Sequence, residues 1–210
     1  MIIESFPVGP LGCNTTLIGD PEGHDAIIVD PGDEIPRIYK RLTAQGLILR
    51  QILITHAHLD HVGGALQLKE MTGAPIYMNE NDLPLLQMVE QQAEWMGIAP
   101  PAVALPDKGL NEGDTVGLPG LEATVLCTPG HTQGSVCLYF AGLHLLVAGD
   151  TLFAGSVGRT DLPGGNYQQL LESIRTQLLP LPDETRVLTG HGPSTTIGAE
   201  RRGNPFLHLR

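Results

Sequence analysis

The chain has 210 residues, and 41% of them are hydrophobic, which is enough to build a substantial core in one large domain. Asp and Glu number 23 against 12 Lys and Arg, and the net charge of −11 argues against a general attraction to nucleic acid or to an anionic membrane surface. No apolar stretch approaches the roughly 20 residues that span a bilayer, and the N-terminal residues carry no secretory signal. Three cysteines are too few for a disulfide framework, so we expect a cytoplasmic protein in a reducing compartment.

Short apolar runs bounded by turn residues predict eight strands. In chain order they are residues 15–19, 26–30, 51–55, 74–78, 123–127, 135–140, 143–149 and 185–190. Amphipathic stretches predict three helices, at residues 34–46, 63–73 and 166–180. Pro36 lies early in the first helix and Gly46 ends it, whereas Asn166 caps the third and Pro180 ends it.

The order of these elements favours an α/β (α+β) protein with a two-sheet core and helices outside, because strands outnumber helices and the helices are scattered between groups of strands. We find no repeat and no linker, so residues 1–210 are expected to form a single domain. Residues 80–113 read as a variable insert, a helix followed by a Pro-rich loop that we expect to lie over the functional site. Residues 198–210 form a short C-terminal tail.

The stretch THAHLDHVGG, residues 55–64, places three imidazoles and a carboxylate within six positions directly after an apolar strand. His56 and His58 are two residues apart, so an extended segment points both to the same side, whereas a helix would turn them about 200° apart. This spacing excludes a helical zinc motif of the H-E-x-x-H type. Asp60 and His61 follow where the chain turns into the helix expected near Gly63, and they approach from a second direction, so one loop can serve two metal ions.

Four predicted buried strands each lead to a side chain of a metal-binding type. The residues that follow these strands are His56, His131, Asp150 and His191. Sites are usually built by the loops at the ends of the strands of a sheet, so we expect these side chains to converge. A single histidine beside an apolar strand is more often structural, and the metal interpretation depends on the whole set.

The full set is five imidazoles and two carboxylates, which is enough for two ions. In this assignment one ion takes His56, His58 and His131, and the other takes Asp60, His61 and His191. Asp150 bridges the two ions. Nitrogen and oxygen ligands without thiolate favour two divalent ions, zinc first with iron or manganese as alternatives, over a closed structural site. Open coordination positions and the residual positive charge predict catalysis through a developing oxyanion.

The other polar residues considered lie outside these clusters of metal-binding residue types. Asp30, in VDPGD, either supports a ligand imidazole through a hydrogen bond or shapes its Pro-Gly turn. Cys127 is expected to be a small buried hydrophobe, and Trp95 to pack within the insert. The remaining histidines are expected on the surface, and they are His24, His144 and His208.

With these residues in hand, the chain resembles the metallo-β-lactamase superfamily. The motifs that carry the resemblance are VDPG at 29–32, THAHLDHVGG at 55–64, PGHTQGSV at 129–136, AGDTLF at 148–153 and GHGP at 190–193. The resemblance implies the four-layer αβ/βα sandwich of the metallo-β-lactamase fold. It also implies that the seven positions named above are the ligands of two metal ions, with Asp150 between them.

Two further segments, GSVGRTDLPGG at 155–165 and GAERRGNPFL at 198–207, are similar to the glyoxalase II group and in particular to its short bacterial members. That group hydrolyses S-2-hydroxyacyl-glutathione thioesters to a hydroxy acid and glutathione. By this resemblance Arg159 becomes a candidate for holding a substrate carboxylate, with a loop salt bridge as the alternative. The helical extension by which longer members grip glutathione is not found here, so the expected partner is a small-molecule thioester whose thiol carrier is glutathione or another thiol.

The mechanism implied by this resemblance is hydrolysis by a hydroxide that bridges the two ions and attacks the thioester carbonyl. Asp150 holds the bridge, and Asp60 also orients the hydroxide. The motifs leave the oligomeric state open, a homo-oligomer included. The exported β-lactamases fit less well, because some carry cysteine or serine where Asp150 stands, and the nucleases of the superfamily carry extra substrate-binding regions.

A second reaction class shares part of the pattern. Persulfide dioxygenases also resemble this sequence in the HxHxDH string and in GRTD, and they use a single iron held by the equivalents of His56, His131 and Asp150. The GHGP and RTDLPGG segments look more like the short glyoxalase II group, so hydrolysis is the leading hypothesis and a mononuclear-iron persulfide dioxygenase is the alternative.

Overall fold

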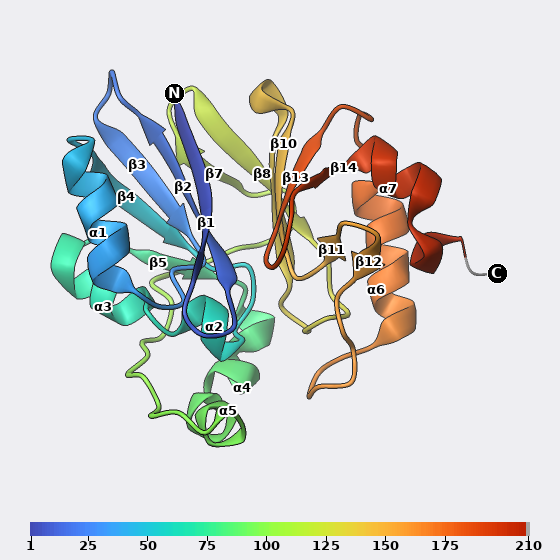
Figure 1. Ribbon diagram of the computed structural model, residues 1–210, viewed down its shortest axis with the longest axis horizontal. Helices are drawn as coiled ribbons and strands as arrows, with labels where there is room; N and C mark the ends of the chain where they lie inside the picture. The colour runs from blue at the N-terminus through green and yellow to red at the C-terminus, as the bar shows by residue number, and fades with distance from the viewer. Residues whose placement is uncertain (209–210) are drawn as a thin grey trace. The chain divides into compact units, whose positions relative to one another are not determined.

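The computed structural model describes residues 1–208, which form two compact units, Met1–Gly109 and the residues from Leu110 onward. Each unit contains one six-stranded sheet (Figure 1). The predicted tail at 198–210 is described up to residue 208, and its last two residues lie outside the described part of the chain. No helix among the described residues is long and apolar enough to cross a membrane.

The sheet of the first unit is antiparallel at one edge and parallel at the other, in the strand order β1-β2-β3-β4-β5-β6. Its strands are β1 (Ile2–Val8), β2 (Cys13–Asp20), β3 (Asp25–Val29), β4 (Ile48–Leu53), β5 (Ile76–Met78) and β6 (Lys108–Gly109). From β1 to β3 neighbours run antiparallel, and from β3 to β6 they run parallel. The carboxyl ends of β3 and β4 therefore lie at the same edge.

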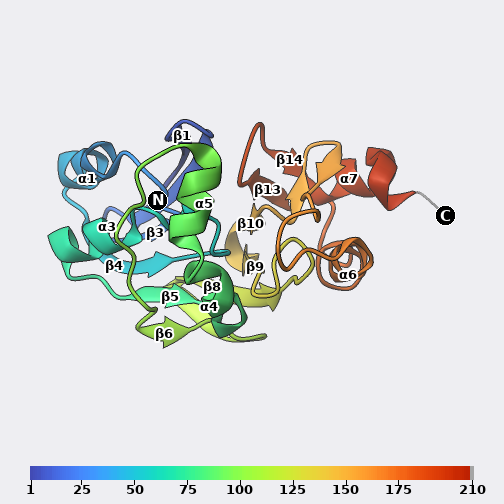
Figure 2. The same ribbon diagram turned by 90° about the horizontal axis from the view of Figure 1, so that it is seen from below.

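Helices cover this sheet and follow its strands. They are α1 (Ile35–Ala44), α2 (Leu59–Val62), α3 (Ala65–Thr72), α4 (Leu83–Leu86) and α5 (Val89–Met96), with a 3₁₀ turn at Glu80–Asp82. On α1 the buried residues Ile35, Ile38 and Leu42 recur at helical spacing and join one apolar core with strand residues such as Ile28 and Ile52. Beyond α5 the chain runs through residues 97–107 to β6 (Figure 2).

The second unit holds the strand order β14-β13-β10-β9-β8-β7. Its strands are β7 (Thr115–Leu118), β8 (Leu121–Cys127), β9 (Val136–Phe140), β10 (Leu145–Gly149), β13 (Arg186–Thr189) and β14 (Thr195–Thr196), with a small separate pair β11 (Leu152–Phe153) and β12 (Ser156–Val157). Strands β10 and β13 are parallel, and the other neighbours are antiparallel. As a result β8, β10 and β13 all run in the same direction.

Two helices pack on this second sheet. They are α6 (Tyr167–Ser173), which continues into a π-helical turn at Ile174–Leu178, and α7 (Ile197–Gly203); 3₁₀ turns occupy Ala141–Leu143 and Pro205–Leu207. Leu170, Ile174 and Ile197 from these helices share a buried core with Leu146 and Val187 of the sheet. The predicted cap is present, because the Asn166 side chain accepts a hydrogen bond of 3.1 Å from the Gln169 amide.

All eight predicted strands and all three predicted helical segments are present. The prediction missed the elements with weak or very short patterns, which are β1, β6, β7, β11, β12, β14 and α7. The helix expected at residues 63–73 is α3, and an additional helical turn that was not predicted, α2, precedes it from Leu59, so Asp60 and His61 lie on this turn. His58 is extended and starts that turn, and α3 begins only after the glycine pair that follows α2.

Three smaller expectations need correction. The insert at 80–113 holds two short helices, α4 and α5, in place of one. Trp95 was expected to pack inside the insert, but 54% of its surface is exposed, because it lies on the outward side of α5. Cys127 was expected to be buried, yet it is only partly buried, because it is the last residue of β8.

Candidate metal centre

The first cluster of polar side chains lies where β3 and β4 end. These strands are parallel neighbours, with Val29 paired to Leu53, so the residues that follow them, Asp30 and Thr55, come together. Asp30 is 1% exposed and has a positive φ of 51°, a left-handed conformation that Asp and Asn tolerate better than most residues. This conformation turns the chain sharply at the end of β3 while the carboxylate stays inside the unit.

The Asp30 carboxylate accepts three hydrogen bonds. Its Oδ1 accepts one of 2.8 Å from the Thr55 amide, and its Oδ2 accepts one of 2.6 Å from the Thr55 hydroxyl. Oδ2 also accepts one of 2.9 Å from Nδ1 of His61, which is fully buried. A buried carboxylate needs such partners, and here they bind it to one histidine of the HxHxDH motif.

These bonds also determine which nitrogen of two imidazoles carries the proton. The Thr55 hydroxyl has one hydrogen and donates it to Asp30, so at 3.0 Å from Nδ1 of His56 it acts as the acceptor. His56 and His61 therefore both carry a proton on Nδ1, and Nε2 has the lone pair that a metal ion requires.

The other members of the motif lie close by. The ring centroids of His56 and His58 are 4.8 Å apart, and those of His56 and His61 are 4.1 Å apart. Oδ2 of Asp60 is 3.7 Å from Nε2 of His61, which is longer than a hydrogen bond. Two atoms that bind one zinc ion at tetrahedral angles lie about 3.4 Å apart, so this pair has a separation that suits a shared ion.

Glycines of the VDPG and HVGG segments allow the two turns to pack directly on each other. A Cβ added to Gly32 would lie 1.5 Å from the carbonyl oxygen of Asp60, and one added to Gly64 would lie 2.4 Å from the carbonyl oxygen of Pro31. No side chain fits in either place. The backbone of α2 is therefore held against the turn that carries Asp30.

Two buried polar residues from the insert support the same loop from its other side, and the sequence analysis missed both. Asp82 accepts a hydrogen bond of 2.9 Å from the Ala57 amide. Gln92 accepts one of 2.9 Å from the Leu59 amide and donates to the carbonyl oxygens of Ala57 and Leu85. The expectation that the insert lies against the site thus holds for the HxHxDH loop. The only signal for this supporting role in the sequence was the presence of a polar Asp and Gln in an otherwise amphipathic stretch.

The second cluster lies at the edge where β8, β10 and β13 end. His131 follows β8, Asp150 follows β10 and His191 follows β13. The buried hydroxyls of Thr128 and Thr151 are 2.9 Å apart and join the ends of β8 and β10. Common strand direction thus brings together three of the residues that the sequence singled out.

Asp150 lies between the two histidines of this unit. Its Oδ2 is 3.6 Å from Nε2 of His131 and 3.7 Å from Nε2 of His191, again too long for hydrogen bonds and close to the spacing of atoms around a shared ion. The carboxylate is 13% exposed, and the imidazole of His191 is 29% exposed. One carboxylate oxygen facing two ring nitrogens is the arrangement expected of a metal-bridging residue.

Arg159 contributes in a way that the sequence did not reveal. Its backbone carbonyl oxygen accepts a hydrogen bond of 2.7 Å from Nδ1 of His131, so this imidazole also carries its proton on Nδ1 and its lone pair on Nε2. The guanidinium pairs with both oxygens of Asp161, at 2.8 and 2.7 Å, and holds the pKa of that carboxyl down at about 2. The loop salt bridge therefore exists, and the role of Arg159 in binding a substrate carboxylate stays a prediction.

The residues predicted to be uninvolved lie apart from both clusters. His24, His144 and His208 are exposed. His144 is 3.7 Å from the carboxylate of Glu184 on the surface. These three histidines are therefore not candidates for the metal centre.

Comparisons with known proteins show sequences and structures that are similar to this chain. The sequence pattern described as the Metallo-beta-lactamase superfamily matches residues 8–191. A protein of Haemophilus influenzae named hydroxyacylglutathione hydrolase GloC is 43% identical over 212 residues, which cover 100% of both chains.

Three solved structures are similar over nearly the whole chain. BLEG-1 B3 metallo-beta-lactamase has a TM-score of 0.92 at 35% identity, covering 99% of this chain and 100% of that one. TTHA1623 in a di-iron-bound form has a TM-score of 0.88 at 43% identity, covering 97% and 100%. ETHE1 from Myxococcus xanthus has a TM-score of 0.82 at 30% identity, covering 98% and 84%.

Proposed function

Since this chain belongs to the metallo-beta-lactamase superfamily and has its mixed α/β fold, we propose that it is a binuclear metallohydrolase that cleaves thioesters of the S-2-hydroxyacyl-glutathione type. The full-length similarity to a protein named hydroxyacylglutathione hydrolase supports the thioester class. The proposed substrate is a small molecule, with glutathione or another thiol as its carrier.

The observation that carries the proposal is the state of the ring nitrogens. Nδ1 of His56, His61 and His131 is committed to a hydroxyl, a carboxylate and a carbonyl oxygen respectively. Each imidazole therefore offers Nε2 as a metal ligand, and ligand histidines in metal sites are held in this way. The donor set of nitrogen and carboxylate oxygen fits divalent zinc, iron or manganese.

We assign the ligands as the sequence suggests. One ion would be held by His56, His58 and His131, and the other by Asp60, His61 and His191. Asp150 would be shared by both ions, and the position of its Oδ2 opposite two ring nitrogens supports this role. Asp30 is hydrogen-bonded directly to His61 and, through the Thr55 hydroxyl, to His56. These bonds keep both rings in the orientation that metal binding requires.

When bound, the ions would supply Lewis acidity and lower the pKa of water. In the proposed reaction the oxygen of water bonds to the thioester carbonyl carbon, the carbon–sulfur bond breaks, and a carboxylic acid and a thiol are released. Asp60 also orients the attacking water, and its carboxylate, which is 17% exposed, is accessible to solvent. Thiolate is a good leaving group, so the residues described here need not include a strong general acid.

A persulfide dioxygenase with one iron is a second candidate function. We retain it because ETHE1 from Myxococcus xanthus is among the similar structures. It would use His56, His131 and Asp150, a set of two histidines and one carboxylate that suits iron and leaves positions for oxygen. The metal is therefore the most informative unknown. Zinc is our first choice, and the di-iron-bound form of TTHA1623 supports iron as an alternative.

The deciding experiment counts metal ions per chain and measures three activities on the same preparation. We expect two ions per chain and release of thiol from S-D-lactoylglutathione. One iron per chain with oxygen consumption on glutathione persulfide would instead establish the dioxygenase. A β-lactam is included because BLEG-1 is named a B3 metallo-beta-lactamase, and its efficient hydrolysis without thioester cleavage would contradict the proposal.

A further inference from the structure

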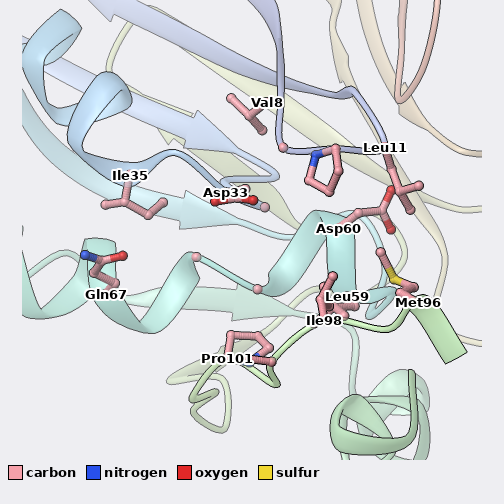
Figure 3. A pocket seen from close by; sticks show the side chains of 16 residues that line it. Val8, Leu11, Asp33, Ile35, Leu59, Asp60, Gln67, Met96, Ile98 and Pro101 are labelled. Carbon is pink, nitrogen blue, oxygen red and sulfur yellow. The ribbon is translucent and has the colours of Figure 1, made fainter. Parts of the chain in front are cut away.

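A pocket of about 210 Å³ lies within the first unit and has the Asp60 side chain in its wall (Figure 3). Four segments line it, which are the turn between β1 and β2, the turn that leads into α1, the α2–α3 region, and the end of α5 with the chain that follows it. In Figure 3, Asp60, Leu11 and Met96 are seen toward one end of the pocket, and Ile35 and Gln67 toward the other. The pocket therefore begins beside a proposed metal ligand and extends away from it.

The wall of this pocket is mostly apolar. Val8, Leu59, Met96, Ile98 and Pro101 contribute aliphatic or thioether groups. A cavity of about 150 Å³ with such a lining holds one benzene molecule, so this pocket has room for about seven or eight non-hydrogen atoms. A lactoyl group would leave much of that space empty, whereas an unbranched acyl chain of about six carbons would fill it.

The charge of the lining decides which part of a thioester can enter. Two carboxylates, Asp33 and Asp60, face the pocket, and no Lys, Arg or His is among its lining residues. Gln67 supplies the remaining polar side chain. A carboxylate placed in this pocket would meet the negative charge of Asp33, which no basic lining residue balances, whereas the proposed metal ion would offset the charge of Asp60. The glutathionyl part of a thioester, which carries two carboxylates, is therefore excluded from the pocket.

We propose that this pocket binds the acyl chain of the substrate, and that it selects uncharged aliphatic acyl groups of about five to seven carbons. This inference rests on the proposed thioester hydrolysis, because it places the reacting carbonyl beside Asp60. It adds the acyl class, and it makes Met96, at the end of α5, and Ile98, in the segment after it, determinants of chain length. Asp33 becomes the determinant that rejects acyl groups with a terminal acid.

The first test uses thioesters of N-acetylcysteamine, a small uncharged carrier, with acetyl, butanoyl, hexanoyl, octanoyl and adipoyl groups. We expect kcat/KM for hexanoyl to exceed that for acetyl at least 10-fold. Adipoyl has the same length as hexanoyl but ends in a carboxylate, and we expect it to react at least 30-fold more slowly than hexanoyl. Equal rates for acetyl and hexanoyl, or for hexanoyl and adipoyl, would overturn the inference.

Two matched substitutions test whether the pocket itself is responsible. Ile98 is 41% exposed and lines the pocket, whereas Ile48 is 52% exposed and does not. I98W should narrow the pocket and lower kcat/KM for hexanoyl at least 10-fold while acetyl changes less than 3-fold. I48W should change neither substrate by more than 2-fold. An equal loss for both substrates in I98W would contradict the assignment.

Charge is tested separately with Asp33. Its side chain is exposed and accepts a hydrogen bond from the Glu34 amide, which an asparagine oxygen can also accept. D33N should raise kcat/KM for adipoyl relative to hexanoyl at least 5-fold. An unchanged ratio would show that Asp33 does not exclude acids from the pocket.

A binding measurement separates failure of this inference from failure of the proposed function. Hexanamide, a neutral ligand with eight non-hydrogen atoms, is titrated into the whole protein and followed by ligand-observed NMR. We expect I98W to weaken its binding at least 5-fold and I48W to leave it unchanged. If no thioester is cleaved but this difference persists, the pocket stands and the hydrolase proposal falls. If thioesters are cleaved but hexanamide binds all three proteins equally, the pocket assignment falls.

Discussion

Oδ2 of Asp30 accepts a hydrogen bond of 2.9 Å from Nδ1 of His61, and both side chains are almost completely buried. Through the Thr55 hydroxyl the same oxygen also determines the protonation of His56. One carboxylate at the end of β3 thus orients two histidines of the HxHxDH motif.

The substitution D30N tests this relationship. Asparagine tolerates the left-handed backbone of position 30, so the turn should survive, but its amide nitrogen would face donors. We expect metal affinity to fall about 10–100-fold and the free energy of unfolding to drop by about 1–3 kcal/mol. Metal titration and urea unfolding measure the two effects. D33N is the matched control for metal affinity, and an equal loss there would contradict the prediction.

Replacing Asp150 tests the proposed bridge. D150A removes the carboxylate that faces Nε2 of both His131 and His191. Both proposed metal ions would therefore lose the oxygen ligand that they share. We expect the metal content to fall below one ion per chain and hydrolysis to fall more than about 100-fold, since even residues that only support a ligand cost 10–100-fold. Elemental analysis and the thioester assay measure this, with E122A, an exposed acidic residue of β8, as the control. Two retained ions with normal turnover would remove Asp150 from the bridge.

The insert contributes to stability through Gln92. Q92M keeps much of the side-chain volume but leaves the buried Leu59 amide without its partner, whereas the carbonyl oxygen of Leu85 keeps its hydrogen bond from the Met88 amide. An unsatisfied buried donor costs about 1–3 kcal/mol, so we expect the free energy of unfolding to fall by about that amount. Q91M changes the exposed neighbour on α5 and should be neutral within about 0.5 kcal/mol. Urea unfolding of the two variants gives the comparison, and equal stabilities would refute the role of Gln92.

Gly32 should not accept any side chain. G32A would place a Cβ 1.5 Å from the carbonyl oxygen of Asp60, so α2 would have to move away from the VDPG turn. We expect a loss of about 3 kcal/mol or more, or no folded protein. Gly142 has no atom within 4 Å of an added Cβ and its φ is not positive, so G142A should leave the melting temperature almost unchanged. A normal melting temperature for G32A would show that the close packing does not exist.

The pH dependence of thiol labelling follows from the environment of Cys127. Burial, with the nearby Glu112 carboxylate, raises the pKa of its thiol from 9.0 to about 11. At pH 8 the thiolate fraction is therefore about 100-fold lower than in the unfolded chain, and iodoacetamide labelling should be slower by a similar factor. Because the pKa is raised, the rate should keep climbing about tenfold per pH unit above pH 9. A plateau near pH 9, measured by mass spectrometry of the Cys127 peptide, would contradict this.

Much of the fold could be predicted from local sequence patterns, and particular elements show why. The strand β3 is a nearly continuous apolar run, and α1 repeats its buried residues at helical spacing, so both could be predicted from short windows. The two-residue strands β11, β12 and β14 contain too few residues for any pattern. The turn α2 was not predicted, because it has only four residues and the two glycines that follow it suggest a helix that starts later.

By itself the sequence determined which residue types stand at the ends of which strands, and this led to the family and to the seven positions that we propose as metal ligands. Only the tertiary structure decided how those donors are held. Asp82 and Gln92 bond to the HxHxDH loop across 25 and 33 residues of chain, and the carbonyl of Arg159 meets His131 across 28. Such contacts depend on where the backbone passes in space, and a carbonyl or amide group is the same at every position of a sequence. The supporting bonds of this site thus leave no sequence pattern, although they set the proton positions on which its chemistry depends.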